Sequence, residues 1–390
     1  MRPAWVEVDL DAIQHNVAAI ARHLRGRGRG GRDPEIMAVV KANAYGHGAV
    51  PVALACLAAG ATRLAVATVE EAIALRRAGI AAPIHILGTP PASQAALVVA
   101  HNVSCGVADR SLAEALSQAA VSQQKTAKVH IKVDTGMGRL GILPEQVVGF
   151  ARELRRLPRL EIAGLYSHLA TADEADKSFA YQQLSRFQEV AQSLEEAGIP
   201  VPFCHLANSA AILDMPEAAL DGVRPGIILY GLYPSSAVDR GQVALQPALS
   251  LKARLNSLKT LPPHSGVSYG QLWYTRTAQR VGVVPLGYAD GYSRLLSGQT
   301  EVLLGGRRVP AVGRICMDQF MVAIPDDLEA SVGDEVVLIG RQGGESISAD
   351  EVAEKLGTIS YEVLSILSPR LPRVYVRDGR TIVERGLEAD

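Results

Sequence analysis

Short apolar segments alternate with helical patterns along most of the chain, and this alternation limits the possible fold more than any other feature of the sequence. The apolar segments have the length of buried strands and lie at 36–41, 63–68, 83–88, 103–108, 128–133, 160–167, 203–207 and 223–230. Helical spacing occurs between most of them, at 48–59, 69–78, 91–100, 110–120, 144–157 and 174–197. Strands and helices that alternate in this way form parallel βα units, so eight strands predict a (β/α)8 TIM-like barrel.

A further helical pattern precedes the first apolar segment. Apolar residues recur at helical spacing over 11–24, and Asp9 or Asp11 is the expected cap. The connection after the last predicted strand is too short for a full helix. The helix at 11–24 is therefore our candidate for the element that closes the ring.

The pattern changes after about residue 243. Strand-like segments now meet at glycine turns, at Gly305-Gly306 and Gly343-Gly344, and only 349–367 has helical spacing. These features predict a second, mostly antiparallel β domain. We expect the barrel to span 1–243 and the β domain to span 244–390.

Charge and composition exclude several classes of protein. The net charge of −1 gives no electrostatic basis for binding nucleic acid or a membrane. The arginine–glycine stretch at 25–32 allows RNA binding, but a mobile surface loop is the favoured interpretation. The first ten residues lack the apolar core of a signal peptide, and no apolar run reaches membrane-spanning length. Four scattered cysteines predict reduced thiols in a cytoplasmic protein.

The barrel prediction has a consequence for chemistry, because active-site groups of such barrels lie at the C-terminal ends of the strands. Lys41 ends the first apolar segment, His168 ends the sixth, and Asn208 follows the seventh. A glycine-rich segment, 134–139, follows the fifth. Arg224 fits less well, since it stands at the start of the eighth predicted strand.

Lys41 has two interpretations. A lone lysine is most often an exposed cation in a surface ion pair. The alternative is an amine that forms a Schiff base with a carbonyl cofactor, with a pKa that burial has lowered. Gly46 and Gly48 follow it closely and predict a loop that approaches a bound ligand.

The ordered set of motifs resembles the bacterial alanine racemases. The segment that resembles their cofactor-lysine motif is Val39-Val40-Lys41-Ala42-Asn43-Ala44-Tyr45-Gly46-His47-Gly48. Other motifs follow in the family's order over nearly the whole chain: 134–141, His168, Asn208-Ser209, Arg224-Pro225-Gly226, 266–270, 287–291 and Cys316-Met317-Asp318. The main departure is the 25–32 stretch, which resembles a lengthened loop.

The resemblance implies pyridoxal 5'-phosphate as cofactor, held by Lys41 as an aldimine. Its phosphate is expected to bind the motif Asn208-Ser209, backbone amides near Gly226 and Ile227, and the hydroxyls of Tyr45 and Tyr361. Asn208-Ser209 is also typical of a helix start, and both interpretations are compatible, because a helix N-terminus attracts anions.

Arg224 is implied to face the pyridine nitrogen of the cofactor. Arginine keeps its proton, so the ring nitrogen stays unprotonated and the ring is a weaker electron sink. A short-lived carbanion suits a racemase, because the proton must return to Cα rather than be lost to transamination. An ordinary ion-pair role for Arg224 is the alternative.

Racemisation needs one base on each face of Cα. The resemblance assigns Lys41 to one face and Tyr269 to the other, with His168 beside Tyr269 and linked in turn to Arg224. The alternatives are a hydrogen-bonded core histidine for His168 and simple turn packing for Tyr269 between its flanking glycines.

Arg139 resembles the family residue beside the substrate carboxylate, where its cation suits an anionic partner. Lys132 matches a lysine that is carbamylated in several members, a change that would orient Arg139. An unmodified, exposed Lys132 is the alternative.

The resemblance further implies a homodimer with shared active sites. Tyr269, Met317 and Asp318 are expected to reach the site of the second subunit, Met317 near the substrate. The residues that match the family's entryway are Asp173, Tyr288, Arg294, Arg314 and Tyr361. A narrow entry with a tyrosine at Tyr361 favours a substrate with a small side chain such as methyl.

These implications predict a cytoplasmic alanine racemase that interconverts L- and D-alanine and so supplies D-alanine for peptidoglycan. Three alternatives stay open at this point. They are a serine or broad-specificity amino-acid racemase on the same scaffold, a barrel decarboxylase of basic amino acids, and a non-enzymatic pyridoxal-phosphate-binding protein. Arg224 and Tyr269 argue against the decarboxylase, and the second domain argues against the small non-enzymatic carrier.

Overall fold

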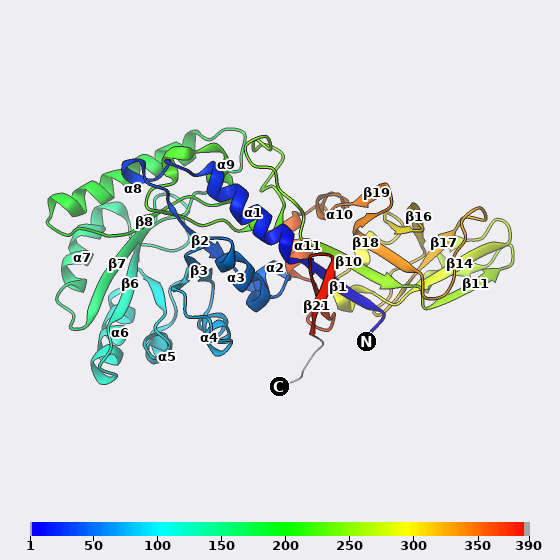
Figure 1. Ribbon diagram of the computed structural model, residues 1–390, viewed down its shortest axis with the longest axis horizontal. Coiled ribbons are helices and arrows are strands. Elements are labelled where there is room, and N and C mark those ends of the chain that lie inside the picture. The colour runs from blue at the N-terminus through cyan, green and yellow to red at the C-terminus, as the bar shows by residue number, and fades with distance from the viewer. Residues whose placement is uncertain (1, 386–390) are drawn as a thin grey trace. The chain divides into compact units, whose positions relative to one another are not determined.

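The structure is a computed structural model that describes residues 2–385. The chain divides into two compact units (Figure 1). The barrel unit comprises 12–44 and 49–247. The sheet unit comprises the first eleven residues, the short segment Tyr45–Gly48, and the chain from Ala248 onward.

The barrel unit contains a closed barrel of parallel strands, as the alternation predicts. The strands in order are β2 (Glu35–Val39), β3 (Arg63–Val66), β4 (Ile84–Ile86), β5 (Ser104–Val107), β6 (Ala127–Lys132), β7 (Leu160–Tyr166), β8 (Cys204–His205) and β9 (Gly222–Val223). β2 closes the ring by pairing with β9, with Glu35 opposite Gly222. The inner and outer faces of these strands are both covered, which explains their nearly continuous apolar sequences.

Helices surround this barrel in the predicted positions (Figure 1). They are α3 (Ala49–Ala58), α4 (Val69–Arg77), α5 (Ala95–Ala100), α6 (Arg110–Ser122), α7 (Val147–Leu154), α8 (Ser178–Glu196) and the short α9 (Ser209–Asp214). The first helix, α1, spans Leu10–His23. Its buried Asn16 side chain donates to the carbonyls of Leu229 and Gln246, so α1 packs against the segment that follows β9.

The eighth predicted strand, 223–230, is wrong in its extent. β9 ends at Val223, and Ile227–Tyr230 form a 3-10 helix, η5. Pro225 has no N–H to donate to a neighbouring strand, and Gly226 has φ −115° and ψ −95°, outside the strand region. Arg224 therefore follows the C-terminal end of its strand, where active-site groups of such barrels lie, and does not start the strand as predicted.

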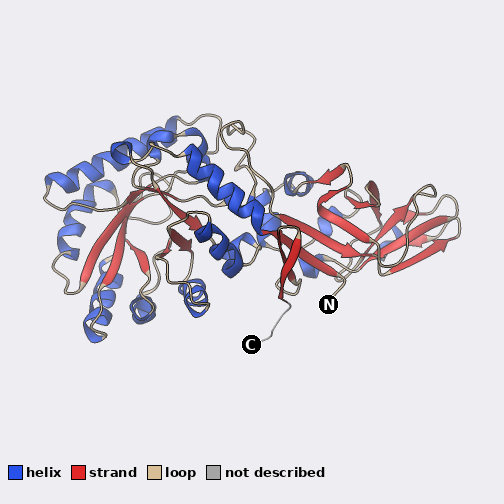
Figure 2. Cartoon of the chain, in the orientation of Figure 1, coloured by secondary structure: helices blue, strands red, loops and turns tan. Residues whose placement is uncertain are grey.

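The sheet unit is mostly antiparallel, as predicted (Figure 2). Its large sheet has the order β11-β14-β17-β16-β15-β18-β10-β1-β20-β21, and β19 pairs with β18. The bounds are β1 (Ala4–Asp9), β10 (Leu249–Arg254), β11 (Ser257–Leu261), β14 (Gln279–Val284), β15 (Glu301–Leu304), β16 (Arg307–Val312), β17 (Phe320–Ile324), β18 (Glu335–Gln342), β19 (Glu345–Ile347), β20 (Arg373–Arg377) and β21 (Arg380–Arg385). A small hairpin joins β12 (Gly266–Val267) to β13 (Trp273–Tyr274).

The glycine turns predicted in this unit are confirmed. Gly305-Gly306 connects β15 to β16, and Gly343-Gly344 connects β18 to β19. The helical pattern at 349–367 forms two helices, α10 (Ala349–Leu356) and α11 (Ser360–Ser365). They are separate because Gly357 ends α10 in the left-handed conformation at φ 68°.

The strand β1 was not predicted from the sequence. It lies inside the large sheet, antiparallel to β10 and parallel to β20. Six residues at the start of a chain give little periodicity, and both pairing strands lie more than 200 positions later. The N-terminal segment thus belongs to the sheet unit and not to the barrel.

Two expectations about class can be compared with the structure. No helix within residues 2–385 combines the length and apolarity that a membrane span requires. All four cysteines are free, and three of them are buried. The arginine–glycine stretch contains only the short 3-10 helix η1 (Arg29–Gly31), and most of its residues are exposed.

Candidate active site

Lys41 lies directly after β2 and begins a strained turn, α2 (Lys41–Tyr45). The next four residues all have left-handed φ values, between 51° and 54°. Each non-glycine residue in this conformation costs about 1–2 kcal/mol, so tertiary contacts must hold the turn. The Ala42 N–H donates to Glu71 Oε1 at 2.6 Å, and the Ala49 N–H donates to Asn43 Oδ1 at 2.9 Å.

The electrostatic environment of Lys41 favours a neutral amine. Burial lowers the pKa of Lys41, the nearby charge of Arg139 lowers it further, and Glu71 opposes the shift. A neutral amine is the form that attacks a carbonyl group or accepts a proton. Strain in the turn and the lowered pKa together mark Lys41 as more than a surface cation.

Gly46 and Gly48 have a packing role that the sequence did not predict. Both have positive φ values, 85° and 100°. A Cβ atom on Gly46 would overlap the Leu364 carbonyl oxygen, and one on Gly48 would overlap the Tyr375 hydroxyl. These glycines therefore permit close packing within the sheet unit.

The loop after β6 presents Arg139. Asp134 Oδ1 accepts from the N–H groups of Gly136 and Gly138, both at 3.0 Å. The chain then returns to pair with its own start, because the Asp134 N–H donates to the Ile142 carbonyl. Arg139 lies exposed on this closed loop, and its charge acts on Lys41, Lys132 and His168.

Lys132, at the end of β6, is buried and not exposed. Its amine lies 4.3 Å from the centre of the Tyr166 ring. Burial, with the charges of Arg224 and Arg139, lowers the pKa of Lys132 to about 7. A large fraction of this amine is therefore neutral near neutral pH.

Arg224 is buried, and protein atoms bind almost all of its donors. Nη1 donates to His205 Nδ1 at 2.7 Å and to the His205 carbonyl at 2.8 Å. Nη2 donates to the carbonyls of Ser167 at 2.7 Å and Leu206 at 2.9 Å. Of the five N–H groups of the guanidinium, only Nε–H has no acceptor among the described residues. One donor in a fixed direction remains for a ligand.

His168 is near Arg224 but is not hydrogen-bonded to it. The guanidinium donors of Arg224 bind His205 and backbone carbonyls, so the predicted link from His168 to Arg224 is not a direct hydrogen bond in the described chain. Burial and then the charge of Arg224 lower the pKa of His168 to about 3. His168 is therefore a neutral imidazole beside a group of cations.

Asn208 and Ser209 form the start of α9 after β8. Asn208 is the helix cap, since its Oδ1 accepts from the Ala211 N–H at 3.0 Å. Ser209 Oγ accepts from the Gly226 N–H at 2.8 Å, so the Gly226 amide is occupied by the protein. The Ser209 hydroxyl hydrogen and the Ile227 amide have no acceptor among the described residues. These two groups remain as donors for an anion.

Most of the remaining predicted residues lie in the sheet unit, where hydrogen bonds bring their loops together. Ser268 Oγ donates to the Arg314 carbonyl at 2.7 Å, which fixes the turn that carries Tyr269. The Tyr288 N–H donates to the Cys316 carbonyl, next to Met317. Ser297 Oγ accepts from the Ile315 N–H and donates to the Arg294 carbonyl, so Arg294 and Arg314 belong to the same group of loops.

Most of the predicted side chains in this group are exposed. Tyr269 is 71% exposed and Met317 is 52% exposed. Arg370 holds the neighbouring Asp318 with a 2.6 Å hydrogen bond and also contacts the buried Asp290. The loops are thus rigid, while the side chains that the motifs single out have no cover within their unit.

The structure places the predicted residues in two sets. Lys41, Lys132, Arg139, His168 and Arg224 interact electrostatically at the mouth of the barrel, and Asp173 lies in the same unit, where its carbonyl accepts from Ser235. Tyr45 and Tyr361 belong to the sheet unit, with ring centres 6.0 Å apart. Burial raises the pKa of Tyr45 to about 12.

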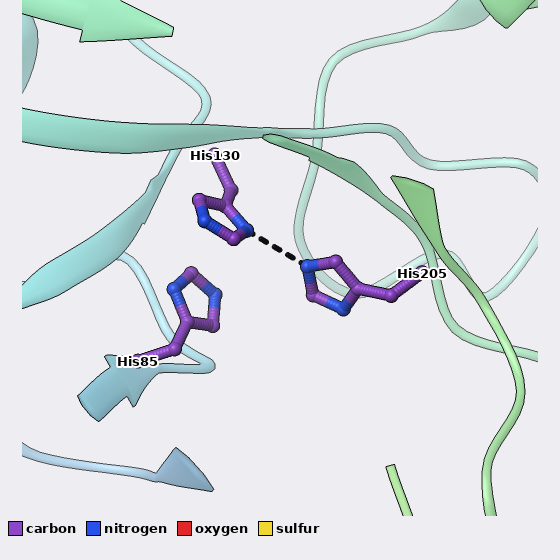
Figure 3. Close-up of side chains that lie close together, drawn as sticks. All are labelled: His85, His130 and His205. Atoms are coloured by element: carbon purple, nitrogen blue, oxygen red, sulfur yellow. Dashed lines mark hydrogen bonds between the residues drawn. The ribbon is translucent and has the colours of Figure 1, made fainter. Parts of the chain in front are cut away.

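Sequence reasoning missed a layer of histidines inside the barrel. His85, His130 and His205 come from β4, β6 and β8, and their rings lie together (Figure 3). Tyr166 stacks on His205 with ring centres 4.8 Å apart. Each histidine stands between two apolar neighbours in its strand. Their common position on alternate strands of a barrel was the signal that could have grouped them.

Comparisons with known proteins agree with the two-part architecture. A family model described as "Alanine racemase, N-terminal domain" matches residues 8–234, and "Alanine racemase, C-terminal domain" matches 248–375. A relative named alanine racemase from Clostridium tetani is 45% identical over 98% of this chain and 97% of its own length.

Solved structures are also similar. The crystal structure of alanine racemase from Bacillus anthracis with bound L-Ala-P has a TM-score of 0.92 and 44% identity, and the match covers 99% of this chain and 98% of that one. A histidine racemase from Leuconostoc mesenteroides has a TM-score of 0.88 and 31% identity, over 96% of this chain and 98% of that one.

Proposed function

The chain belongs to the alanine racemase family, and from this premise we propose that it interconverts L- and D-alanine with pyridoxal 5'-phosphate as cofactor. The enzyme is an isomerase. The observation that carries the proposal is the arrangement at the barrel mouth. A low-pKa lysine on a strained turn lies in the same unit as an arginine that keeps a single free donor.

The residues present fit this cofactor. Arg224 Nε–H is suited to the pyridine nitrogen, Lys41 to the carbonyl carbon, and the Ser209 hydroxyl with the Ile227 amide to the phosphate. Tyr45 and Tyr361 are proposed to add hydroxyl groups to the phosphate. When bound, pyridoxal phosphate withdraws electrons from Cα of the amino acid and so acidifies its proton. Arg224 limits this withdrawal, because it cannot transfer a proton to the ring nitrogen.

We assign the two bases to Lys41 and Tyr269. Lys41 moves the proton on one face of Cα, and its lowered pKa supports the neutral amine that this step needs. Tyr269 moves the proton on the other face, and a phenol needs a polarising neighbour for that task. His168, whose pKa is lowered by burial and then by the charge of Arg224, is proposed to accept a hydrogen bond from Tyr269 as a neutral imidazole.

We propose that Tyr269 and Met317 complete the active site of a partner subunit. The exposure of both side chains supports this, since a base open to water is poorly suited to Cα chemistry. A two-fold dimer then builds two equal sites, each with residues from both chains. Asp173, Tyr288, Arg294 and Arg314 are proposed to line the entry to that shared site.

Lys132 is proposed to be carbamylated. Its neutral amine would attack carbon dioxide, form an N–C bond and release one proton to solvent. The product is an anion among the charges of Arg224, Arg139 and Lys41, where a cation is unfavourable. We expect this anion to hold Arg139 toward the substrate carboxylate, which Arg139 and Met317 would contact.

A second candidate is a racemase with another or a broader range of substrates. The similar structure of a histidine racemase supports this alternative, because the same scaffold serves a larger side chain. Tyr361 in the proposed entry favours alanine over bulky substrates. The supply of D-alanine for peptidoglycan and a cytoplasmic location stay predictions from the family resemblance.

The test is a visible spectrum of the purified protein followed by a panel of L-amino acids on the same sample. We expect the absorption of a lysine-bound pyridoxal group and the fastest racemisation with alanine. A bound cofactor with faster turnover of serine or histidine would select the second candidate. Absence of a cofactor after incubation with pyridoxal phosphate would contradict both.

A further inference from the structure

Arg224 is the end of a chain of buried hydrogen bonds that runs through two histidines. Arg224 Nη1 donates to His205 Nδ1 at 2.7 Å. His205 Nε2 and His130 Nδ1 are hydrogen-bonded at 2.8 Å (Figure 3). His130 and His205 are both fully buried inside the barrel. These hydrogen bonds connect Arg224, which is proposed to contact the cofactor, through the His205 ring to His130.

The protons in this chain have only one consistent arrangement. Arginine can only donate, so His205 Nδ1 must accept from Arg224. Neutral His205 then carries its proton on Nε2 and donates it to His130 Nδ1. Burial keeps both rings neutral, and the charge of Arg224 acts in the same direction, since the pKa of His130 falls to about 3 and that of His205 falls well below its usual value.

We propose that His130 is a positioning residue for the reaction, because it holds His205 in the Nε2–H tautomer and thereby fixes Arg224 with its Nε–H directed at the cofactor nitrogen. This inference rests on the proposed function for its effect on catalysis. Its structural part, the tautomer of His205, stands on the hydrogen bonds alone.

The surroundings of His130 support a position that is set by packing. A Cβ atom on Gly164, in the neighbouring strand β7, would lie 2.6 Å from His130 Nδ1. Tyr166 stacks flat on His205 and donates its hydroxyl to the Leu87 carbonyl at 2.7 Å. Neither imidazole can turn without moving a neighbour in this close-packed layer.

A metal site is the competing explanation, because three histidines with suitable atoms lie within 4.8 Å of one another. Two facts oppose it. His130 Nδ1 and His205 Nε2 are hydrogen-bonded to each other. A metal cation here would also lie beside Arg224 and Lys132. His85 differs from the other two, since it binds Ser104 and contacts His130 only by stacking, at 4.2 Å.

Three substitutions distinguish the effect of the His205–His130 hydrogen bond from the effect of packing in the histidine layer. His130→Leu removes the acceptor, so the buried Nε2–H of His205 has no partner and the Nδ1–H tautomer competes. His130→Asn is expected to rescue, because its amide oxygen takes the place of Nδ1. His85→Leu is the matched control, which removes an equally buried histidine of the same layer from outside the chain.

The first measurement is neutron diffraction from crystals of the full-length protein, which locates the exchangeable proton on His205. We expect it on Nε2 in wild type, His130→Asn and His85→Leu, and on Nδ1 in part in His130→Leu. The second is racemisation kinetics, where His130→Leu should lower kcat by about tenfold or more with little change in KM, and His130→Asn should restore most of it.

The outcomes distinguish this inference from the proposed function. A proton on His205 Nδ1 in a wild-type protein that racemises alanine would overturn the positioning role alone. The expected proton in a protein without racemase activity would contradict the proposed function alone. Equal losses of kcat in His130→Leu, His130→Asn and His85→Leu would assign the layer to packing. Zinc bound one per chain and lost in His85→Leu would replace the hydrogen-bond chain with a metal site.

Discussion

The two sets of predicted site residues differ in how completely their own unit holds them. At the barrel mouth, Arg224 donates four hydrogen bonds to protein atoms, and Lys132 is buried against Tyr166. In the sheet unit, Tyr269 and Met317 have fixed backbones but exposed side chains. The barrel-mouth set is held within its own unit, whereas the sheet-unit set has a hydrogen-bonded backbone and exposed side chains.

This difference indicates which properties each set controls. Arg224 and Lys132 are buried and form no ion pair among the described residues, and they shift the pKa values of their neighbours, an effect that depends on a water-free environment. Exposed side chains on rigid loops are suited to completing a site elsewhere, since they gain their surroundings on assembly. Substitutions in the first set should change the chemistry, and those in the second should depend on the partner.

The largest effect is expected at Lys41. Lys41→Ala removes both the attachment point and one base, so racemisation should fall by about 10,000-fold or more. Borohydride reduction followed by peptide mapping should attach the cofactor to Lys41 in wild type. The matched control is Lys128→Ala, an exposed lysine on β6, which should keep full activity. A label on any other lysine would contradict the site.

Tyr269→Phe should have the next largest effect, about 1,000-fold, and it should depend on direction. The exchange of the Cα proton of L-alanine is expected to be lost far more than that of D-alanine, because Lys41 still serves the D face. Proton NMR in deuterium oxide measures both rates on one sample. Equal losses of Cα proton exchange for the two enantiomers would contradict the assignment of Lys41 and Tyr269 to opposite faces.

Arg224→Glu should lower racemisation by about 100-fold and make transamination detectable. A carboxylic acid can protonate the ring nitrogen, which strengthens the electron sink and allows the amino group to pass to the cofactor with release of pyruvate. The measurement is pyruvate formed per racemisation event. Wild-type rates without pyruvate would show that the fixed donors of Arg224 have no chemical role.

Co-expression of Lys41→Ala and Tyr269→Phe tests whether the exposed set serves the partner. Each variant alone should be inactive. Random assortment makes about half of the dimers mixed, and one of two sites in each mixed dimer is then intact, so activity should return to about a quarter of wild type. Mixed dimers purified with two affinity tags but without activity would place both bases in one chain.

The smallest effect concerns Lys132 and stability. Its native pKa of about 7 lies below its usual value of 10.5, so above pH 7 the unfolded state binds more protons and stability rises with pH. In carbon dioxide-free buffer, the Tm of wild type should rise from pH 7 to pH 9 by about 2–4 °C more than that of Lys132→Met. At a fixed pH, added bicarbonate should raise the Tm of wild type but not that of Lys132→Met, because the carbamate forms only in the folded state and stabilises it. A wild-type Tm that does not respond to bicarbonate would argue against carbamylation.

The barrel was predictable because its strands and helices alternate locally. Seven of the eight strands lie where the apolar segments indicate, and the eighth was misplaced because Ile227–Tyr230 is apolar whether it forms a strand or a turn. The strand β1 was missed because its partners are distant in sequence. Local patterns identify elements, whereas pairing across the chain depends on tertiary contacts.

The candidate site was predicted as a set of residues but not as a set of contacts. The motif around Lys41 identifies the lysine, yet the left-handed turn that holds it depends on Glu71 from α4. The resemblance named Arg224, while its partner His205 lies in a strand where polar residues are usually structural. Interactions between strands that are far apart in sequence leave no local pattern.

The position of β1 has a consequence for the order in which the protein can fold during synthesis. This strand is synthesised before the barrel, yet β10 and β20, which flank it, are made after the whole barrel. The barrel unit can begin to fold before then, because its strands pair with near neighbours in sequence. Residues 4–9 therefore stay unpaired until β10 has emerged, and their second neighbour, β20, follows only near the end of synthesis. A nascent-chain factor bound to residues 4–9 would accordingly delay the sheet unit more than the barrel.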